Sequence, residues 1–191
     1  MRSRRLVAST VSPLTRLLPA VVAALAVSFL GAMALSGQIR EGGQFVRFVA
    51  AGVLTQTPAE VDRVELSTGA QQWTFTRAAG GWQIEPGAAP VRPPLATRLD
   101  DSLKFLHASA PIRVMLRDEW LPHGLREFGL EPPAYSVALF QSGRRLLAVG
   151  FGSPNPQKVL QYMRIEGEDR VYVMSRSVGQ EWEQVFTEAR R

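Results

Sequence analysis

Two histidines and a few carboxylates are the side chains of this chain that could support acid-base or metal chemistry. His123 lies in the segment WLPHG, shortly after Asp118 and Glu119, so a carboxylate paired with His123 could act as a general acid-base pair in a hydrolase. A zinc site needs three or four ligands at ordered spacings, and Glu119 with His123 matches no known zinc motif. We therefore expect no metal site and no cofactor.

Other catalytic patterns are absent from the sequence. No serine lies in a Gly-x-Ser-x-Gly nucleophile elbow, and Gly150-Phe151-Gly152 lacks the third glycine and the helix of a dinucleotide-binding loop. The chain has no cysteine, which excludes disulfides and thiolate metal sites. Although catalytic triads can assemble from distant residues, we expect a protein that is not an enzyme and has no catalytic residues.

The segment RDEWLPHGLREFGLEPP, residues 117–133, is rich in side chains that favour protein binding. Aromatic residues and arginine are enriched at the centres of protein interfaces, and this segment contains both. The alternative is that its apolar side chains fold under the loop as a satellite cluster. An upstream segment, QFVRFVAAGVLTQ, is expected to be a helix whose apolar face packs on the domain or lies against a bilayer or a partner. The candidate interaction surface comprises Arg117, Trp120, Leu121, His123 and Arg126, together with Phe45 and Phe48 of the upstream segment.

These segments must be placed relative to a membrane, because residues 17–35 form an uncharged apolar run that can contact the lipid bilayer. A helix of this length rises about 28 Å at roughly 1.5 Å per residue, close to the thickness of the hydrocarbon core. Four arginines precede the run, so residues 1–16 are expected to stay in the cytoplasm as a basic leader. Ala32-Met33-Ala34 also fits a small-x-small cleavage site, so the run could instead be a signal peptide. Either interpretation exports the rest of the chain.

The charge of the chain follows the same division. The sequence pI is about 10.4 and the net charge is +5, but residues 1–35 carry four arginines and no acidic side chain. Setting those four aside leaves 18 basic against 17 acidic side chains, so the exported part is nearly neutral. No large basic patch remains for DNA or RNA, and we expect no nucleic-acid partner. The expected location is the cytoplasmic (inner) membrane, with a single span, a cytoplasmic N-terminus and a periplasmic or extracytoplasmic C-terminal domain.

Residues 36–56 are expected to form a juxtamembrane linker and the amphipathic helix, and residues 57–191 the extracytoplasmic domain. Thr57 to Glu60, TPAE, has the elements of a capping box and starts a short helical turn. VDRVELS alternates as a half-buried strand, and WTFTRAAGGWQIE predicts a hairpin.

The second half of the domain repeats this mixture of helix and hairpin. Residues 93–106 carry four leucines at helical spacing, and Asp100 and Lys104 are placed to pair on the exposed side. IRVML then predicts a strand, YSVALF with RLLAVGF a second hairpin, and QYMRIE with VYVMS a third. Ser177, with Gln180 three residues later, is expected to cap a C-terminal helix. The predicted class is α+β, mostly antiparallel hairpins packed with a central and a C-terminal helix and preceded by one transmembrane helix.

The order of these segments is similar to that of a known protein family. A single N-terminal membrane segment, the VDRVELS strand and WTFTRAAGGWQIEP with Trp82 and Pro86 come first, and the leucine helix, FGLEPP, LLAVGF and YMRIEGEDRVYVM follow. Over residues 55–186 the chain resembles the domain of unknown function DUF4340, in a single copy. The resemblance implies a membrane-anchored, extracytoplasmic module, in some members a partner of ABC-type transport systems such as those linked to gliding motility. It implies no catalytic residues.

Three hypotheses for function follow. The first is a non-enzymatic, membrane-anchored accessory or assembly subunit of an envelope complex, linked to ABC-type transport and binding a membrane or envelope protein. The second is an extracytoplasmic binding module for a small molecule or glycan that uses exposed Trp82, Trp120 or Tyr162. The third is an envelope hydrolase built on His123 with Asp118 or Glu119.

Overall fold

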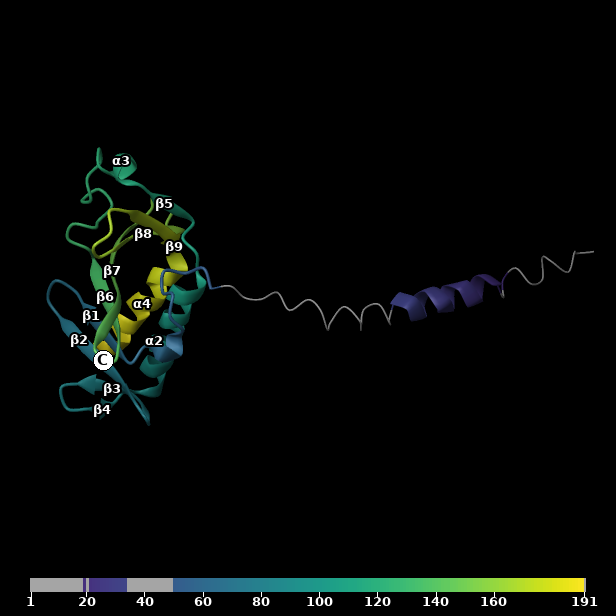
Figure 1. The fold of residues 1–191 in the computed structure, drawn as a ribbon, viewed down its shortest axis with the longest axis horizontal. Helices are drawn as coiled ribbons and strands as arrows, with labels where there is room; N and C mark the ends of the chain where they lie inside the picture. The colour runs from purple at the N-terminus through teal and green to yellow at the C-terminus, as the bar shows by residue number, and fades with distance from the viewer. Residues whose placement is uncertain (1–18, 20, 34–49, 191) are drawn as a thin grey trace, which may run out of the picture. The chain divides into compact units, whose positions relative to one another are not determined.

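The computed structural model describes residue 19, residues 21–33 and residues 50–190 of the chain. The chain divides into two compact units, residues 1–48 and residues 49–191 (Figure 1). In the first unit, residues 21–33 are helical and exposed. Within the described ranges, no helix is both long enough and apolar enough to cross a bilayer. The leader 1–16, parts of the expected span 17–35, and Phe45 and Phe48 lie outside the described residues.

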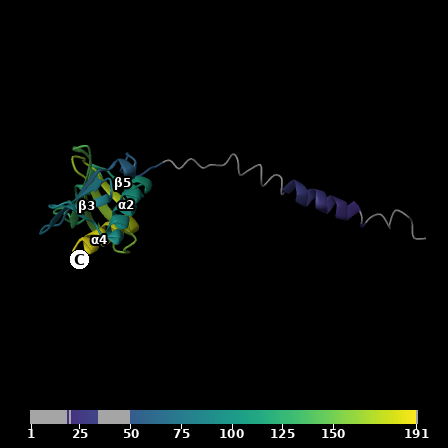
Figure 2. The same cartoon turned by 90° about the horizontal axis from the view of Figure 1, so that it is seen from below.

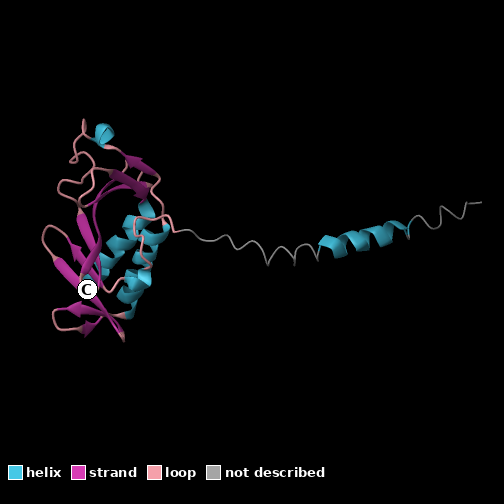
Figure 3. Cartoon of the chain, in the orientation of Figure 1, coloured by secondary structure: helices cyan, strands magenta, loops and turns pink. Residues whose placement is uncertain are grey.

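The second unit is built on a sheet in which every neighbouring pair of strands is antiparallel. The described strands, drawn in magenta in Figure 3, lie in the order β4-β3-β2-β1-β6-β7-β8-β9-β5. Their bounds are β1 Arg63–Ser67, β2 Gln72–Ala78, β3 Gly81–Glu85, β4 Ala89–Pro90, β5 Arg113–Met115, β6 Tyr135–Gln141, β7 Arg144–Pro154, β8 Leu160–Ile165 and β9 Val171–Ser175. The three predicted hairpins are present as β2–β3, β6–β7 and β8–β9, and the α+β class is confirmed.

Two long helices cover one face of this sheet (Figures 1 and 2). They are α2 (Pro93–Ala108) and α4 (Arg176–Ala189), which pack side by side, and the shorter helical turns are η1 (Pro58–Glu60) and α3 (Arg117–Trp120). Alternate side chains of the strands meet the apolar faces of the long helices. The buried core includes Leu95, Leu99, Leu103 and Leu106 of α2, Val178, Trp182, Val185 and Phe186 of α4, and Val64, Leu66, Phe75, Val137, Leu139, Phe151 and Met163 of the sheet. The predicted inward faces of both helices are therefore confirmed.

The start of α4 differs from the predicted one. The helix begins at Arg176, so Ser175 precedes its first turn, and the Ser177 hydroxyl lies 2.9 Å from that of Ser175. β9 leads directly into α4, and the Arg176 guanidinium is held at this junction. It donates to Gln161 Oε1 at 2.7 Å and to Glu183 Oε2 at 2.6 Å. The contact with Gln161 of β8 ties the first residue of the helix to the sheet, which a local capping pattern at Ser177 could not show.

Residues 50–56, the described part of the predicted amphipathic helix, are not helical. The Gly52 N–H donates to the His107 carbonyl at 3.0 Å and the Leu54 N–H to the Leu106 carbonyl at 3.1 Å, so the segment lies against the end of α2. A Cβ at Gly52 would lie 2.0 Å from the Leu106 oxygen, a clash that only glycine avoids. The helix prediction is wrong here because these backbone groups satisfy the terminal carbonyls of α2 instead of bonding to one another.

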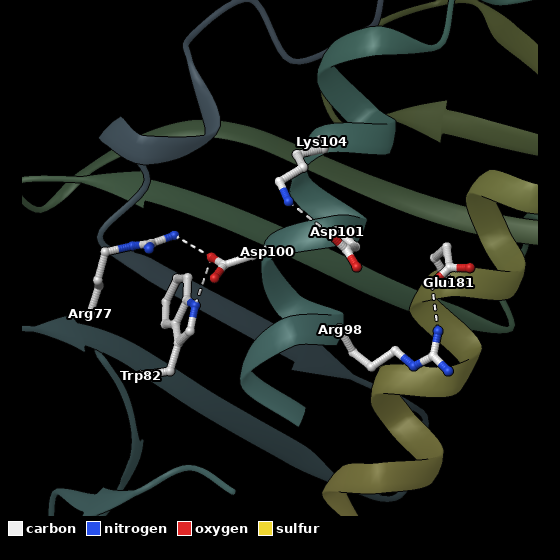
Figure 4. A network of polar contacts seen from close by, with 7 residues as sticks. All are labelled: Arg77, Trp82, Arg98, Asp100, Asp101, Lys104 and Glu181. Carbon is white, nitrogen blue, oxygen red and sulfur yellow. Dashed lines mark hydrogen bonds and ion pairs between the residues drawn. The ribbon is translucent and has the colours of Figure 1, made fainter. Parts of the chain in front are cut away.

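A polar contact joins α2 to the β2–β3 hairpin (Figure 4). Asp100 Oδ1 accepts hydrogen bonds from Arg77 at 2.7 Å and from the indole N–H of Trp82 at 3.0 Å. Lys104, predicted to pair with Asp100, instead contacts Asp101 Oδ1 at 2.8 Å. That prediction is wrong because the buried indole needs an acceptor and the hairpin brings Arg77 to the same oxygen.

Substitution of Asp100 tests this contact, with the adjacent Asp101 as a matched control. Asp100→Asn is expected to lower the free energy of unfolding by about 1 kcal/mol, because it removes a partly exposed ion pair and weakens the acceptor for a buried indole. Asp101→Asn removes only the surface pair with Lys104 and is expected to change it by less than about 0.5 kcal/mol. Chemical denaturation followed by circular dichroism measures both values, and equal effects would contradict the assigned role of Asp100.

Candidate functional site

Residues 117–133 cover part of the sheet face that α2 and α4 leave open. Four apolar side chains are buried there, three from this segment and one from β9: Trp120, Phe128, Leu130 and Val171. The Phe128 and Tyr162 rings meet edge to face with centroids 4.8 Å apart, and the Trp120 indole donates to the Asp169 carbonyl at 3.3 Å. The alternative in which the apolar side chains fold under the loop as a satellite cluster is therefore confirmed for Trp120 and Phe128, with Leu125 partly buried, whereas Leu121 is exposed.

Two glycines let this loop lie directly on β7. A Cβ at Gly152 would lie 2.2 Å from the Phe128 carbonyl oxygen, and one at Gly150 would lie 3.1 Å from the Pro133 side chain. The Ser153 N–H donates to the same Phe128 carbonyl at 2.9 Å. This close approach gives the two glycines a packing role.

The exposed apolar side chains of this region lie beside the loop, at one end of the sheet. Val114 and Leu116 occupy alternate positions on and just after β5, so they share one face of that strand, and Ile112 lies at the bend that precedes it. Leu121 directly follows α3, which begins two residues after β5 ends. These four residues are between 38% and 60% exposed. We call them the edge surface.

β5 is the last strand in the sheet order, and its outer edge meets no other described strand. The Ile112 N–H donates to the Val173 carbonyl of β9 at 2.9 Å. Arg113 and Met115 lie opposite Val173 and Val171, whose peptide groups point to β5, because those of Arg176, Met174 and Tyr172 point to β8. The peptide groups of Arg113 and Met115 therefore face β9, and those of Val114 point to the outer edge. The other end of the sheet, β4 (Ala89–Pro90), is very short and contains proline, which protects it from further pairing. β5 is therefore the edge that can accept another strand.

The charged side chains around β5 are paired with one another. Arg113 and Glu119 form an ion pair, and the second carboxylate oxygen of Glu119 accepts the Leu116 N–H at 2.8 Å. These contacts, first the backbone N–H and then the guanidinium, hold the pKa of Glu119 below its ordinary value. Arg117 pairs with Asp169 at 2.5 Å. The edge surface is thus an apolar strip whose nearest charges are neutralised.

The structure brings the predicted interaction surface together only in part. Arg117, Leu121, His123 and Arg126 are exposed, whereas Trp120 is buried. Sequence reasoning missed the three aliphatic residues of β5 and its flanks. Their alternation with arginine in IRVML was the only signal, and the same alternation fits a half-buried strand inside a sheet.

His123 does not form the acid-base pair considered from the sequence. Its Nδ1 lies 3.3 Å from Glu127 Oε2 on the surface, while Glu119 is bound to Arg113. In the part of the chain that the structure describes, no hydrogen bond joins His123 to Asp118, to Glu119 or to a hydroxyl group. The pairing expected for a hydrolase is therefore wrong. Across residues 50–190, no group of three or more histidine, aspartate or glutamate side chains could hold a metal ion.

The aromatic rings considered as a ligand platform are largely covered. Trp82 and Trp120 are buried, and Tyr162 is half-buried against the second cluster, so the exposed tryptophans that the ligand-binding hypothesis requires are not present. A hollow of about 400 Å³ does lie on the open face of the sheet. Its lining mixes polar, small and aliphatic side chains and contains no aromatic ring; it includes Glu65, Ser136, Ala138, Gly150, Arg164, Leu130 and Val149.

Comparison of the chain with family models, with curated proteins and with solved structures finds no match. The resemblance to DUF4340 therefore stays a prediction from the sequence motifs. The edge surface, rather than a relative, is what points to a function.

Glu119→Gln tests whether this carboxylate holds β5 and α3 together, and Glu127→Gln is the control because the Glu127 carboxylate pairs with the exposed His123 on the surface. Glu119→Gln is expected to speed amide hydrogen exchange in residues 116–120 several-fold at neutral pH and to leave the core strands unchanged. Because folding lowers the pKa of Glu119, its contribution is present at neutral pH and is lost as the pH falls through that lowered pKa. Wild type and variant should therefore converge in acid, and equal exchange at neutral pH would contradict this role.

Proposed function

We propose that this chain is a non-enzymatic docking module, tethered to the cytoplasmic membrane and facing the periplasm or cell exterior, that serves as an accessory or assembly subunit of an envelope complex. The observation that carries the proposal is the edge surface. It presents exposed aliphatic side chains beside a free strand edge whose neighbouring charges are paired. Soluble proteins usually protect such edges, and a free apolar edge favours pairing with another chain.

The polar groups beside the edge surface support docking over catalysis. Glu119 is engaged by Arg113 and by the Leu116 N–H, and Asp169 by Arg117. A carboxylate whose oxygens position the backbone and neutralise an arginine is not free to move a proton. Their geometry suits them to holding β5 and α3 in one fixed arrangement, which lowers the entropic cost of binding a partner.

The membrane tether is supported by the composition of residues 21–33. This helix exposes apolar side chains along its length; they include Val21, Val22, Leu25, Val27, Phe29, Leu30 and Met33. A helix that is apolar all round is suited to a lipid or protein interior. The arginines upstream favour a cytoplasmic N-terminus, and the resemblance to DUF4340 implies the same topology and a role beside ABC-type transport.

A double variant, Leu116→Lys with Leu121→Lys, tests the proposed function in the full chain. Wild type, extracted in mild detergent from cells that express it at its native level, is expected to migrate in a complex larger than one 21.0 kDa chain. Two lysines in the edge surface should release the chain from that complex, because burying unpaired charges is costly. Blue native electrophoresis and mass photometry measure the complex.

Val159→Lys is the matched control, since Val159 is an equally exposed aliphatic residue that lies between β7 and β8, outside the edge surface. It should leave the complex intact, and thermal unfolding should show that both variants are folded. A wild-type chain recovered only as a monomer, or a double variant that keeps its complex, would overturn the proposed function.

A further inference from the structure

We propose that the hollow on the open face of the sheet binds a short peptide, with its C-terminal carboxylate on Arg164 and its N-terminal ammonium toward Glu65. The hollow shares no residue with the edge surface, so this inference goes beyond the proposed function and does not depend on it. It comes from the small side chains on the floor of the hollow, the charges on its two sides and the polar groups between them.

Small side chains of two central strands form the floor of the hollow. On the open face, Ser136 of β6 lies opposite Gly150 of β7, and Ala138 of β6 lies opposite Ala148 of β7. These four positions make a square, and β1 and β8 on either side of it contribute long charged side chains. The floor therefore lies below its two sides, and the space of about 400 Å³ is within the size range of small-molecule sites.

The two ends of this square, along the strands, are occupied by larger groups. Leu130 and Pro133 line the end that lies nearest to the loop of residues 117–133. Beyond the opposite end, the Arg63 guanidinium lies 4.0 Å from the centre of the Phe140 ring, which is the residue opposite it on β6. Small side chains are thus confined to two positions on each of the central strands, and the hollow is a bounded space.

Arg164 is the charged group of the hollow that lacks a carboxylate partner. Glu65 and Glu166, the two carboxylates that line the hollow, each pair with an arginine, at 3.4 Å and 2.9 Å respectively. Arg164 is half-buried and its Nε donates to the Glu168 carbonyl at 3.2 Å, and its guanidinium forms no ion pair with the described residues. Its two terminal nitrogens can therefore donate to a planar anion.

A carboxylate matches this group better than a phosphate does. The guanidinium carries one positive charge, and its parallel N–H groups fit the two oxygens of a carboxylate. A doubly charged phosphate would bring a second negative charge near Glu65 and Glu166, with no further cation in the lining to offset it.

The polar groups beside Arg164 suit the amide groups of a peptide. Ser136 and Ser67 follow it in one row across the strands, and Gln72 of β2 continues the row. Hydroxyl and amide side chains both donate and accept hydrogen bonds, as peptide groups require. Within the described part of the chain, none of these three side chains forms another hydrogen bond. A peptide that leaves Arg164 along this row meets unengaged partners.

The spacing of the two charged sides sets the length of the peptide. β1 and β8 are three strand spacings apart, about 14 Å, and the side chains of Glu65 and Arg164 reach inward from both sides. An extended dipeptide or tripeptide spans about 7 to 10 Å. Arg63 contacts Oε1 of Glu65, which leaves Oε2 for the ligand ammonium. The opposite charges at the two sides thus complement those of a short peptide.

Calorimetric titration of the full chain in lipid nanodiscs tests the site, with trialanine as the probe. Trialanine is expected to bind, and its C-terminal amide should bind about tenfold more weakly or worse, because the amide cannot pair with Arg164. Acetyl-trialanine, which lacks the ammonium, should bind several-fold more weakly. Equal binding of trialanine and its C-terminal amide would overturn the proposal, and equal binding of the acetylated peptide would overturn the assignment of Glu65 to the ammonium.

Two variants locate the binding in the hollow. Arg164→Gln should abolish the preference for trialanine over its amide, and Ala148→Leu should block both peptides by filling the floor of the hollow. Arg144→Gln is the matched control, since Arg144 is an exposed arginine of β7 that does not line the hollow. It should bind trialanine as wild type does, and thermal unfolding should show that all three variants are folded. A folded Ala148→Leu chain that still binds trialanine fully would overturn the proposed site.

The results separate this inference from the proposed function. The double variant with lysines at Leu116 and Leu121 should bind trialanine as wild type does, because neither residue lines the hollow. If wild type binds no trialanine at millimolar concentration while those lysines release a complex, the peptide site is wrong and the docking function stands. If trialanine binds and no complex forms, the docking function is wrong and the peptide site stands.

Discussion

Burial of one sheet face beneath α2 and α4 is the constraint on which the rest of the second unit depends. The four leucines of α2 and the apolar side of α4 meet alternate residues of the central strands, and together they form the main core. Because side chains alternate along a strand, this choice of face also decides what every neighbouring residue does. Val64 and Leu66 are covered, while Arg63 and Glu65 must face the open side.

Two helices are too narrow to cover a sheet of this width. Side by side, each roughly 10 Å across, they cover about four strands spaced about 4.8 Å apart. The sheet from β4 to β5 is about twice as wide, so the strands at its two ends lie beyond the helices. At one end, β4 is a two-residue strand that contains proline. At the other, residues 117–133 cross the open face and bury Trp120 and Phe128, but β5 keeps its outer edge and its aliphatic side chains exposed.

The candidate site is therefore the part of the sheet that neither the two helices nor residues 117–133 cover. The loop that carries Trp120 was recognisable from the sequence as rich in interface residues, and so was the alternative that these residues are packed. The two cases cannot be told apart from residue type, since an apolar side chain has the same preference for a core and for a partner. The loop is packed because Gly152 lets its backbone approach the sheet and Val171 offers an apolar surface beneath it.

The sequence by itself determined the local structure: the hairpins, the leucine helix, the α+β class and the near neutrality of residues 36–191. Each follows from periodicity, turn residues or charge counts, which are properties of neighbouring positions. Tertiary structure alone decided which charges pair, where α4 begins and which strand is an edge. Asp100 pairs with Arg77 rather than Lys104, and Arg176 at the start of α4 donates to Gln161 of β8; both partners lie far along the chain. Strand order is likewise a long-range property, so the exposure of Ile112, Val114 and Leu116 had no local signature.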